Sequence, residues 1–304
     1  MAIVVNTNIA SMNAQRSLAA NTHDLKSAME RLSTGSKINS AADDAAGFAI
    51  AESMTAQVRG LSMAAKNAND ALGLLKVIEN ATNDVTDMLQ RIRELAVQAQ
   101  SGTNSSGDVA NLQQEANALI EEIIRVSEDT TYNGNTYLGS DANLINIQVG
   151  YNDGDVIAIQ TYDVDSTELG VKITDTAGGG DDILVALKDS SGNYLDISQT
   201  ANADPAGDGS VNRVPGALEV ITGAIDQVAS YKAEWGAGQN RLNYTVSNLM
   251  NVVEFTTAAR SRIQDADFAV EAARLAKAQV LQQTGTAMLA QANAAPQLAL
   301  QLIK

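Results

Sequence analysis

The stretch "LSMAAKNANDALGLLKVIENATNDVTDMLQRIRELAVQA", residues 61–99, decides the fold. Small and apolar residues recur in it at alternating steps of three and four positions, without a break. The positions of this stripe are Leu61, Ala64, Ala68, Ala71, Leu75, Ile78, Thr82, Val85, Leu89, Ile92, Ala96 and Ala99. A repeat of about 3.5 residues lies along one side of an α-helix and is typical of helices that pack as coiled coils. At a rise of ~1.5 Å per residue, the stretch predicts a rod about 58 Å long.

Two further stripes have the same period. The second follows the helix-breaking segment "SGTNSSGD" at 101–108, so it is free to fold back antiparallel on the first. It consists of Val109, Leu112, Ala116, Leu119, Ile123 and Val126. The third consists of Leu218, Ile221, Ile225, Val228, Trp235, Leu242, Val246, Leu249, Val253, Thr256 and Ile263. We therefore predict a mainly α fold, in which long antiparallel coiled-coil helices share a left-handed seam.

The middle of the chain changes from a helical period to the alternation of β-strands. Ile145, Ile147 and Val149 alternate with polar residues before "YNDGD", and Ile157 and Ile159 alternate after it. An Asp-Gly turn between two such runs predicts a β-hairpin. We also predict a second hairpin within residues 183–198, with its turn at Ser190 to Asn193. Glycine, proline and acidic residues around it predict a short, surface-exposed insertion over residues 171–215.

Composition excludes several classes of function. The net charge of −16 disfavours partners that carry negative charge, so we expect neither nucleic acid nor an anionic membrane surface as a ligand. With no cysteine and a single histidine, His23, the chain has no set of residues for a thiol nucleophile or a multi-histidine metal site. We therefore expect no enzyme activity, no cofactor and no metal. The first 18 residues lack the features of a cleaved secretory signal.

The two ends of the chain are apolar and nearly uncharged. No residue between Ala278 and Ile303 carries a charge, and Arg16 is the one charged residue among the first 22. Heptad stripes run along both ends: Leu18, Thr22, Leu25, Met29 and Leu32 at the N-terminus, and Ala278, Leu281, Gly285, Met288, Ala292, Ala295, Ala299 and Leu302 at the C-terminus. Except for Thr22, these residues are our candidates for an interface.

The free-energy cost of ordering the two ends indicates that this interface involves other copies of the chain. Ordering the ends costs about 1 to 2 kcal/mol per residue in backbone entropy, whereas burial of one Leu or Ile recovers only about 1.5 to 3 kcal/mol. Two amphipathic helices that touch only each other leave part of their apolar surface exposed. Contacts between copies are therefore expected to supply the remaining burial, and a head-to-tail interface that does not close produces a filament.

Several segments resemble those of one protein family. They are "VNTNIASMNAQRSL" (5–18), "RLSTGSKINSAADDAAGFAIAESM" (31–54), "LQRIRELAVQAQSGTN" (89–104), "EEIIRVSEDTTYNG" (121–134), "IQVGYNDGD" (147–155), "GAGQNRLNYTVSNL" (236–249) and "SRIQDADFAVEAARLAKAQVLQQTGTAMLAQAN" (261–293). Together they resemble bacterial flagellin, over roughly residues 1–170 and 216–304.

This resemblance implies a location, a set of partners and a division into layers. It implies an extracellular protein, exported unfolded by the flagellar type III apparatus, that assembles into the filament used for swimming. The expected partners are other copies of the chain, an export chaperone, the filament cap and hook-associated proteins. By the same resemblance, residues 1–42 and 265–304 are expected to form the inner core of the filament. Residues 43–170 and 216–264 are expected to form a helical rod with the β-hairpin.

The resemblance further implies recognition of the monomer by a host Toll-like receptor. The residues that match the recognised segment are Arg91, Leu95 and Glu115. In this interpretation Arg91 and Glu115 are polar anchors around the apolar Leu95. The alternative is that Arg91 and Glu115 form an ordinary solvated ion pair, as such residues usually do on helices.

Three other functions remain open from the sequence. An enzyme or calcium site would use Asp153, Asp155, Asp163 and Asp165, although hairpin turns also account for them. A coiled-coil adaptor would use the long stripes but would not explain two uncharged ends. A hook-filament junction protein would share those ends. Growth of filaments from seeds separates the flagellin from the last two.

Overall fold

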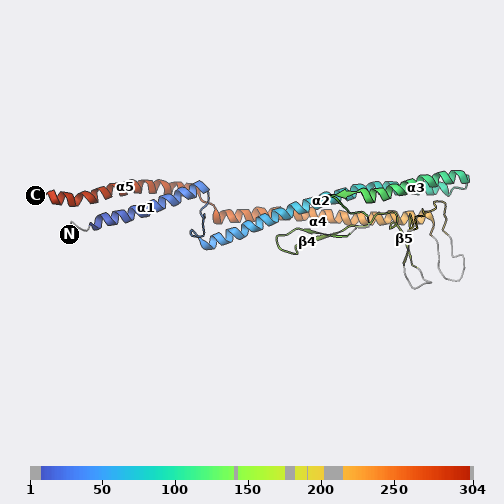
Figure 1. The fold of residues 1–304 in the computed structure, drawn as a ribbon, viewed down its shortest axis with the longest axis horizontal. Helices are drawn as coiled ribbons and strands as arrows, with labels where there is room; N and C mark the ends of the chain where they lie inside the picture. Colours follow the sequence, from blue (N-terminus) through green and yellow to red (C-terminus); the bar gives the residue numbers. More distant parts are fainter. Residues whose placement is uncertain (1–7, 140–142, 175–181, 190, 202–214, 302–304) are drawn as a thin grey trace. The chain divides into compact units, whose positions relative to one another are not determined.

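The computed structural model describes residues 8–139, 143–174, 182–189, 191–201 and 215–301. Its helices are α1 (Ile9–Thr34), α2 (Ala45–Ala99), α3 (Ser106–Asp129), α4 (Ala217–Gln264) and α5 (Phe268–Gln301). Its strands are β1 (Thr131–Tyr132), β2 (Asn135–Thr136), β3 (Leu144–Gln148), β4 (Val156–Gln160), β5 (Gly170–Thr174) and β6 (Asp182–Ala186). The prediction of a mainly α fold with small β-hairpins is confirmed (Figure 1).

The chain divides into two compact units. One consists of Met1–Arg59 with Asn251–Lys304, and the other of Gly60–Met250. The long helices α2 and α4 run through both units. We call the first the terminal unit and the second the rod unit, and each is described by itself.

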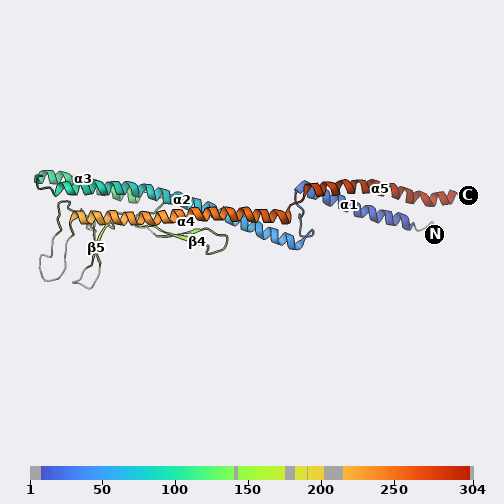
Figure 2. The ribbon, with the colours of Figure 1, turned by 180° about the vertical axis from the view of Figure 1, so that it is seen from behind.

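The rod unit is built around the long stripe of α2. Every position of the predicted stripe, from Leu61 to Ala99, is buried. A second stripe, Leu74, Ala81 and Leu95, is buried as well. Figures 1 and 2 show why: in both views α2 lies beside both α3 and α4, so a wider arc of its surface is covered.

Helix α3 begins where the sequence provides a cap. The Ser105 side chain accepts a hydrogen bond from the Asp108 backbone N–H, and the Asp108 side chain accepts one from the Ser105 backbone N–H. This reciprocal capping satisfies backbone donors that the first turn leaves without partners. The helix buries Ala116, Ile120 and Ile123 against the core. Of the predicted stripe, Val109, Leu112, Leu119 and Val126 are half-buried.

Helix α4 contributes an aromatic cluster to the same core. Trp235 is 2% exposed, and its indole Nε1 donates a hydrogen bond to the Gln160 carbonyl oxygen at 2.9 Å. Beside it, the rings of Tyr162 and Tyr231 are stacked with centroids 3.9 Å apart. The Tyr162 hydroxyl donates to Glu234, and this bond raises the pKa of Tyr162 to about 12. The contacts of this cluster therefore hold the end of β4 against α4.

The predicted hairpin after α3 is confirmed. Strands β3 and β4 pair antiparallel, with Ile145 opposite Ile159 and Ile147 opposite Ile157. A shorter pair, β1 and β2, turns at Asn133 and Gly134, which have φ values of 53° and 83°. Positive φ at both turn residues is typical of the Asn-Gly turns of two-residue hairpins.

The second predicted hairpin is wrong in the partner of its first strand. Strand β6 pairs with β5, with Lys172 opposite Leu184, and not with residues 194–198. The predicted turn is present, because the Asp189 carboxylate accepts hydrogen bonds from the backbone N–H groups of Ser191 and Asn193. Across this turn an isolated bridge joins Lys188 to Tyr194, and the backbone N–H groups of Asp189 and Leu195 donate to the carbonyl oxygens of Asn193 and Leu187.

The segment after β6 returns to the core. Leu187, Leu195 and Ile197 are all buried among the helices of the rod unit. The Gln113 side chain fixes this return, since its Oε1 accepts from the Ile197 backbone N–H at 2.9 Å and its Nε2 donates to the Leu195 carbonyl oxygen. Part of the predicted surface insertion at 171–215 is therefore buried in the rod unit. The calls on residues 175–181, 190 and 202–214 lie outside the described residues.

A close approach between α4 and β5 gives a matched pair of predictions. A Cβ added at Gly223 would lie 2.3 Å from Val171 Cγ2 and 3.1 Å from the Gly170 carbonyl oxygen, whereas one added at Gly236 meets nothing within 4 Å. We expect Gly223→Ala to destabilise the protein by about 1–3 kcal/mol through overpacking. Gly236→Ala is expected to stabilise it by about 0.5–1 kcal/mol, because alanine is the better helix former. Thermal unfolding followed by circular dichroism measures both, and a stabilised Gly223→Ala variant would contradict the packing.

The terminal unit pairs the two ends of the chain. Cα atoms of α1 and α5 approach within 8 Å of each other, and Figure 1 shows the two helices side by side. Gly35, with φ of 71°, ends α1 by donating its N–H to the Arg31 carbonyl oxygen. Next to it, the segments before α5 and after α1 form an antiparallel bridge between Ser36 and Asp265. None of the described helices contains an apolar stretch of the length that a membrane span requires.

Candidate assembly and recognition surfaces

Helix α1 meets α5 through one face. Ala28 is 4% exposed, Leu18, Leu25 and Leu32 are half-buried, and at the far end the Asn8 side-chain Nδ2 donates to the Ala292 carbonyl oxygen at 2.7 Å. Met29, in contrast, is 53% exposed. The structure therefore places most of the predicted α1 stripe at the helix pair and leaves Met29 on the surface.

On α5, too, some residues of the predicted stripe are covered by α1 and others are exposed. Ala278 is buried, and Gly285 and Ala292 are half-buried against α1. A Cβ added at Gly285 would lie 3.3 Å from Leu18 Cδ1, so the two helices approach closely at this point. Leu281 is 39% exposed and Met288 is 64% exposed. The side chains of Ala295 and Ala299 and the whole of Leu302 lie outside the description.

Much of the exposed apolar surface of the terminal unit lies on the four helical segments that compose it. Besides Met29, Leu281 and Met288, its large exposed apolar residues include Ile9, Met12, Ile50, Val252, Phe255, Phe268, Val270 and Val280. Exposed apolar surface on this scale is typical of a protein that buries it against a partner.

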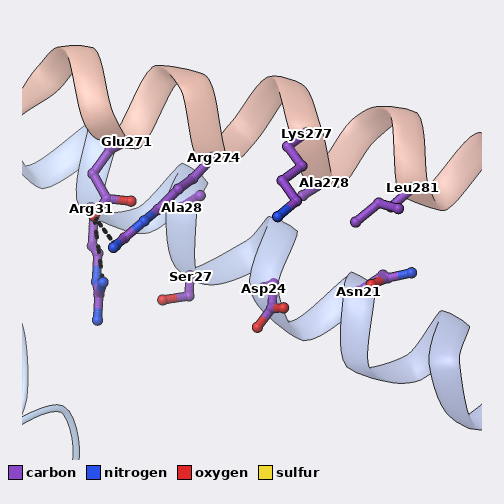
Figure 3. A pocket seen from close by; sticks show the side chains of 10 residues that line it. All are labelled: Asn21, Asp24, Ser27, Ala28, Arg31, Glu271, Arg274, Lys277, Ala278 and Leu281. Atoms are coloured by element: carbon purple, nitrogen blue, oxygen red, sulfur yellow. Dashed lines mark hydrogen bonds and ion pairs between the residues drawn. The ribbon is translucent and has the colours of Figure 1, made fainter.

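A charged cluster at the first turn of α5 was not predicted. Glu271 is only 4% exposed, and its Oε1 accepts a hydrogen bond from Arg274 Nη1 at 2.8 Å and lies 3.5 Å from Arg31 Nη1. Figure 3 shows both arginines converging on this carboxylate, at one end of a 340 Å³ groove between α1 and α5. Asn21, Asp24, Ser27, Lys277 and Leu281 also line the groove. The sequence did contain a signal for the burial of Glu271. It lies seven residues before Ala278 and is therefore on the same face of the helix.

The predicted recognition residues lie on α2 and α3. Arg91 Nε and Nη2 donate to Glu115 Oε1 at 3.0 and 2.9 Å, and Nη1 donates to Glu94 Oε2 at 3.0 Å. These hydrogen bonds raise the pKa of Arg91, and the interaction with Glu115 has the largest effect. The pair is solvent-exposed, so Arg91 and Glu115 are accessible to a partner. Leu95 is only 1% exposed, so it supports this surface from beneath and does not form part of it.

The four aspartates considered for an enzyme or calcium site take part in local turns. Asp155 Oδ2 accepts a hydrogen bond from the Asn152 backbone N–H at 3.4 Å, and Asp163 Oδ1 accepts one from the Asp165 backbone N–H at 2.9 Å. Burial raises the pKa of Asp163. In the part of the chain that the structure describes, no group of three or more His, Cys, Asp or Glu residues is placed to hold a metal ion.

Comparison with known proteins identifies the family. Residues 5–142 match the bacterial flagellin N-terminal helical region, and residues 218–303 match the bacterial flagellin C-terminal helical region. A flagellin of Xenorhabdus nematophila is 41% identical, and flagellin B of Vibrio cholerae is 34% identical, each over 100% of both chains. The crystal structure of Bacillus cereus flagellin is 26% identical, covering 60% of this chain and 88% of that one, with a TM-score of 0.42. Because that score is low, the assignment rests on the sequence matches.

These matches cover the two ends that carry the predicted assembly stripes and most of the rod. The chain belongs to the bacterial flagellin family, a structural family whose members polymerise into the extracellular filament of the flagellum.

Proposed function

We propose that the α1/α5 pair of this filament subunit is unstable by itself and becomes stably folded when neighbouring subunits enclose it. The observation that carries the proposal is the exposure of Met29, Leu281 and Met288, large apolar residues that the helix pair leaves uncovered. The seam between the helices is lined mainly by small or half-buried residues, which recover little free energy for the entropy that ordering costs. Neighbouring copies would supply the missing burial.

The proposed layers of the filament rest on the resemblance to flagellins. Residues 1–42 and 265–304 would form the inner core, with the candidate interface residues at subunit contacts. Residues 43–170 and 216–264 would form the rod layer around it, and residues 171–215 would face outward. The acidic excess between Asp141 and Ser210, where Lys172 and Lys188 are the basic residues, suits a surface in contact with water.

Export in an unfolded state would deliver the chain to the growing end. The chain contains no cysteine, so no disulfide bond would hold it folded before passage through a narrow channel. In this proposal an export chaperone keeps the apolar ends from associating, and hook-associated proteins and a filament cap direct their assembly outside the cell.

Seeded growth tests the assembly proposal. Heat-depolymerised protein mixed with short filament seeds is expected to elongate them, and the helical circular dichroism signal is expected to rise as it does so. Elongation without any gain in helix would mean that the ends were already folded in the free subunit.

We also propose that a host Toll-like receptor recognises the free subunit at the α2/α3 surface. Arg91 and Glu115 would make the polar contacts there. The buried Leu95 would act only by holding α2 and α3 in place, since its side chain does not reach the surface. The support is that an exposed arginine with a fixed, bonded geometry loses little side-chain entropy when it binds a partner.

A comparison of two arginines tests this second proposal. Arg91→Ala is expected to reduce receptor activation by roughly tenfold or more. Its effect on the free energy of unfolding is expected to stay below about 1 kcal/mol, because the ion pair is exposed. The matched control is Arg125→Ala, which removes another exposed arginine with two acidic partners, Glu122 and Asp129. Equal activation of reporter cells by the Arg91→Ala variant and the parent would rule out this site.

A further inference from the structure

The chain contains one Asn-Gly pair, Asn133-Gly134, and it forms the turn between β1 and β2. Asparagine is one of the chemically labile residues of proteins. Both turn residues are exposed, and a Cβ added at Gly134 would meet nothing within 4 Å. The side-chain amide of Asn133 is therefore followed by a backbone nitrogen that no side chain shields.

Hydrogen bonds hold neither of these two groups in place. In the part of the chain that the structure describes, no hydrogen bond involves the Asn133 side chain or the Gly134 backbone N–H. The strands on either side of the turn, β1 and β2, consist of two residues each. So short a strand pair opens locally at a low cost in free energy, and the backbone of the turn can then rotate. Such a rotation brings the Gly134 nitrogen to the carbonyl carbon of the Asn133 side chain.

The two Asn-Ser pairs of the chain show the opposite arrangement. Asn104 Nδ2 donates to the Gln98 carbonyl oxygen, and the backbone N–H of the next residue, Ser105, donates to Asp108 Oδ2 at 3.1 Å. Asn39 and the serine after it are bonded in the same way, through the side-chain amide of one and the backbone N–H of the other. Both groups are therefore held at these two asparagines, whereas both are free at Asn133.

We propose that Asn133 is a self-modification site, at which the chain converts this asparagine into isoaspartate and aspartate with water as the co-reactant. The Gly134 nitrogen attacks Asn133 Cγ and forms a bond to it, while the bond between Cγ and Nδ2 breaks. The proton of the Gly134 N–H leaves with Nδ2 as ammonia, and a succinimide ring remains. Water then opens the ring at either of its carbonyl carbons. Opening at Cγ gives aspartate, and opening at the backbone carbon gives isoaspartate.

Both products change the surroundings of the turn. Asn133 and Asp70 line the same 350 Å³ groove, where the Tyr132 hydroxyl donates to the Asp70 carbonyl oxygen at 3.1 Å. A carboxylate at position 133 adds a second negative charge to this groove, and like charges repel. Isoaspartate also lengthens the main chain by a methylene group, so the turn no longer matches the strands that it joins. We therefore expect conversion to loosen β1 and β2 from α2.

Conversion rates in the folded and the unfolded chain test the proposal. The full-length subunit is incubated at mildly alkaline pH in heavy-oxygen water, either folded or in guanidinium chloride. Peptides are then analysed by mass spectrometry, with fragmentation that distinguishes isoaspartate from aspartate. The heavy oxygen marks only the conversion that occurs during the incubation. Comparing each asparagine with itself in the unfolded chain removes the effect of its neighbours in sequence.

Asn133 is expected to convert in the folded subunit at no less than about one third of its unfolded rate, because opening the turn costs little. The matched control is Asn104, which also lies in the rod unit. It is expected to convert at least about tenfold more slowly in the folded subunit than in the unfolded chain, since the groups that would react are hydrogen-bonded. The proposal is overturned if folding slows Asn133 as strongly as Asn104. Labelled aspartate at position 133 without isoaspartate would also overturn it, because direct hydrolysis forms no ring.

Hydrogen exchange measures the effect of the products on the fold. In the converted subunit the backbone amides of β1 and β2 are expected to exchange at least about tenfold faster than in the fresh subunit. The control is Asn133→Gln, whose longer side chain closes a ring much less readily, and its exchange is expected to stay the same after an identical incubation. Equal exchange in the converted and the fresh parent subunit would contradict the expected loosening.

Discussion

Filament growth is expected to slow by more than about 100-fold when Leu281→Asp and Met288→Asp are combined, since each would bury an unpaired charge at a subunit contact. Both side chains lie on α5 and are exposed in the single subunit, at 39% and 64%. The substitutions therefore leave the rod core of the subunit untouched, and of the two residues only Leu281 lines the groove between α1 and α5. The loss would appear only where a neighbouring subunit covers these positions.

Elongation from seeds, followed by light scattering and electron microscopy, measures this effect. The control is Gln283→Asp combined with Gln291→Asp, which adds the same two charges at exposed polar positions of the same helix. Thermal unfolding of the rod should be the same in all three proteins. Normal elongation by the Leu281→Asp/Met288→Asp variant would show that this face of α5 stays in water in the filament.

Replacement of Trp235 by alanine is expected to destabilise the rod unit by about 3–5 kcal/mol. Trp235 is among the largest fully buried side chains described, and its loss would leave a cavity between α4 and the β3/β4 hairpin. It would also leave the Gln160 carbonyl oxygen without its indole donor. Thermal or denaturant unfolding of the subunit measures the change.

Tyr244→Ala is the matched control, because Tyr244 lies on the same helix at 80% exposure. Its effect on the free energy of unfolding is expected to stay within about 0.5 kcal/mol. If Trp235→Ala cost no more than Tyr244→Ala, the aromatic cluster would not be part of a packed core.

The rod was predictable because its pattern is unambiguous. In α2 the stripe recurs at alternating steps of three and four residues from Leu61 to Ala99 without a break, so one covered face is defined by the sequence alone. The sequence did not show how many neighbours α2 has, because a heptad stripe describes one seam. Leu95 was expected at a binding surface because of the family resemblance, and it is found buried because it belongs to a second seam.

The terminal helices were less predictable for the opposite reason. Alanine and other small apolar residues occupy most faces of α5, so several stripes fit the same sequence. The stripe predicted through Leu281 and Met288 and the one that α1 covers through Gln282 and Leu289 share Ala278, Gly285 and Ala292. Packing against α1 selects between them. Glu271 was missed because the predicted stripe begins at Ala278, in the uncharged part of the chain end, whereas two arginines make the burial of Glu271 possible.

The second β-hairpin shows a limit of local patterns. Its turn was found because Asp, Gly and Asn have strong turn preferences. Its strand pairing was not, because the better partner of β6 lies before it in the chain, at Gly170–Thr174. Residues after the turn are drawn instead to the core through Leu195 and Ile197.

Hydrogen exchange of α1 and α5, compared between free subunits and filaments of the same protein, tests the central claim most directly. We predict rapid exchange of the backbone amides of both helices in the free subunit and strong protection in the filament, while the buried part of α2 is protected in both. Strong protection of α1 and α5 in the free subunit would show that the two ends fold without their neighbours and would contradict the account.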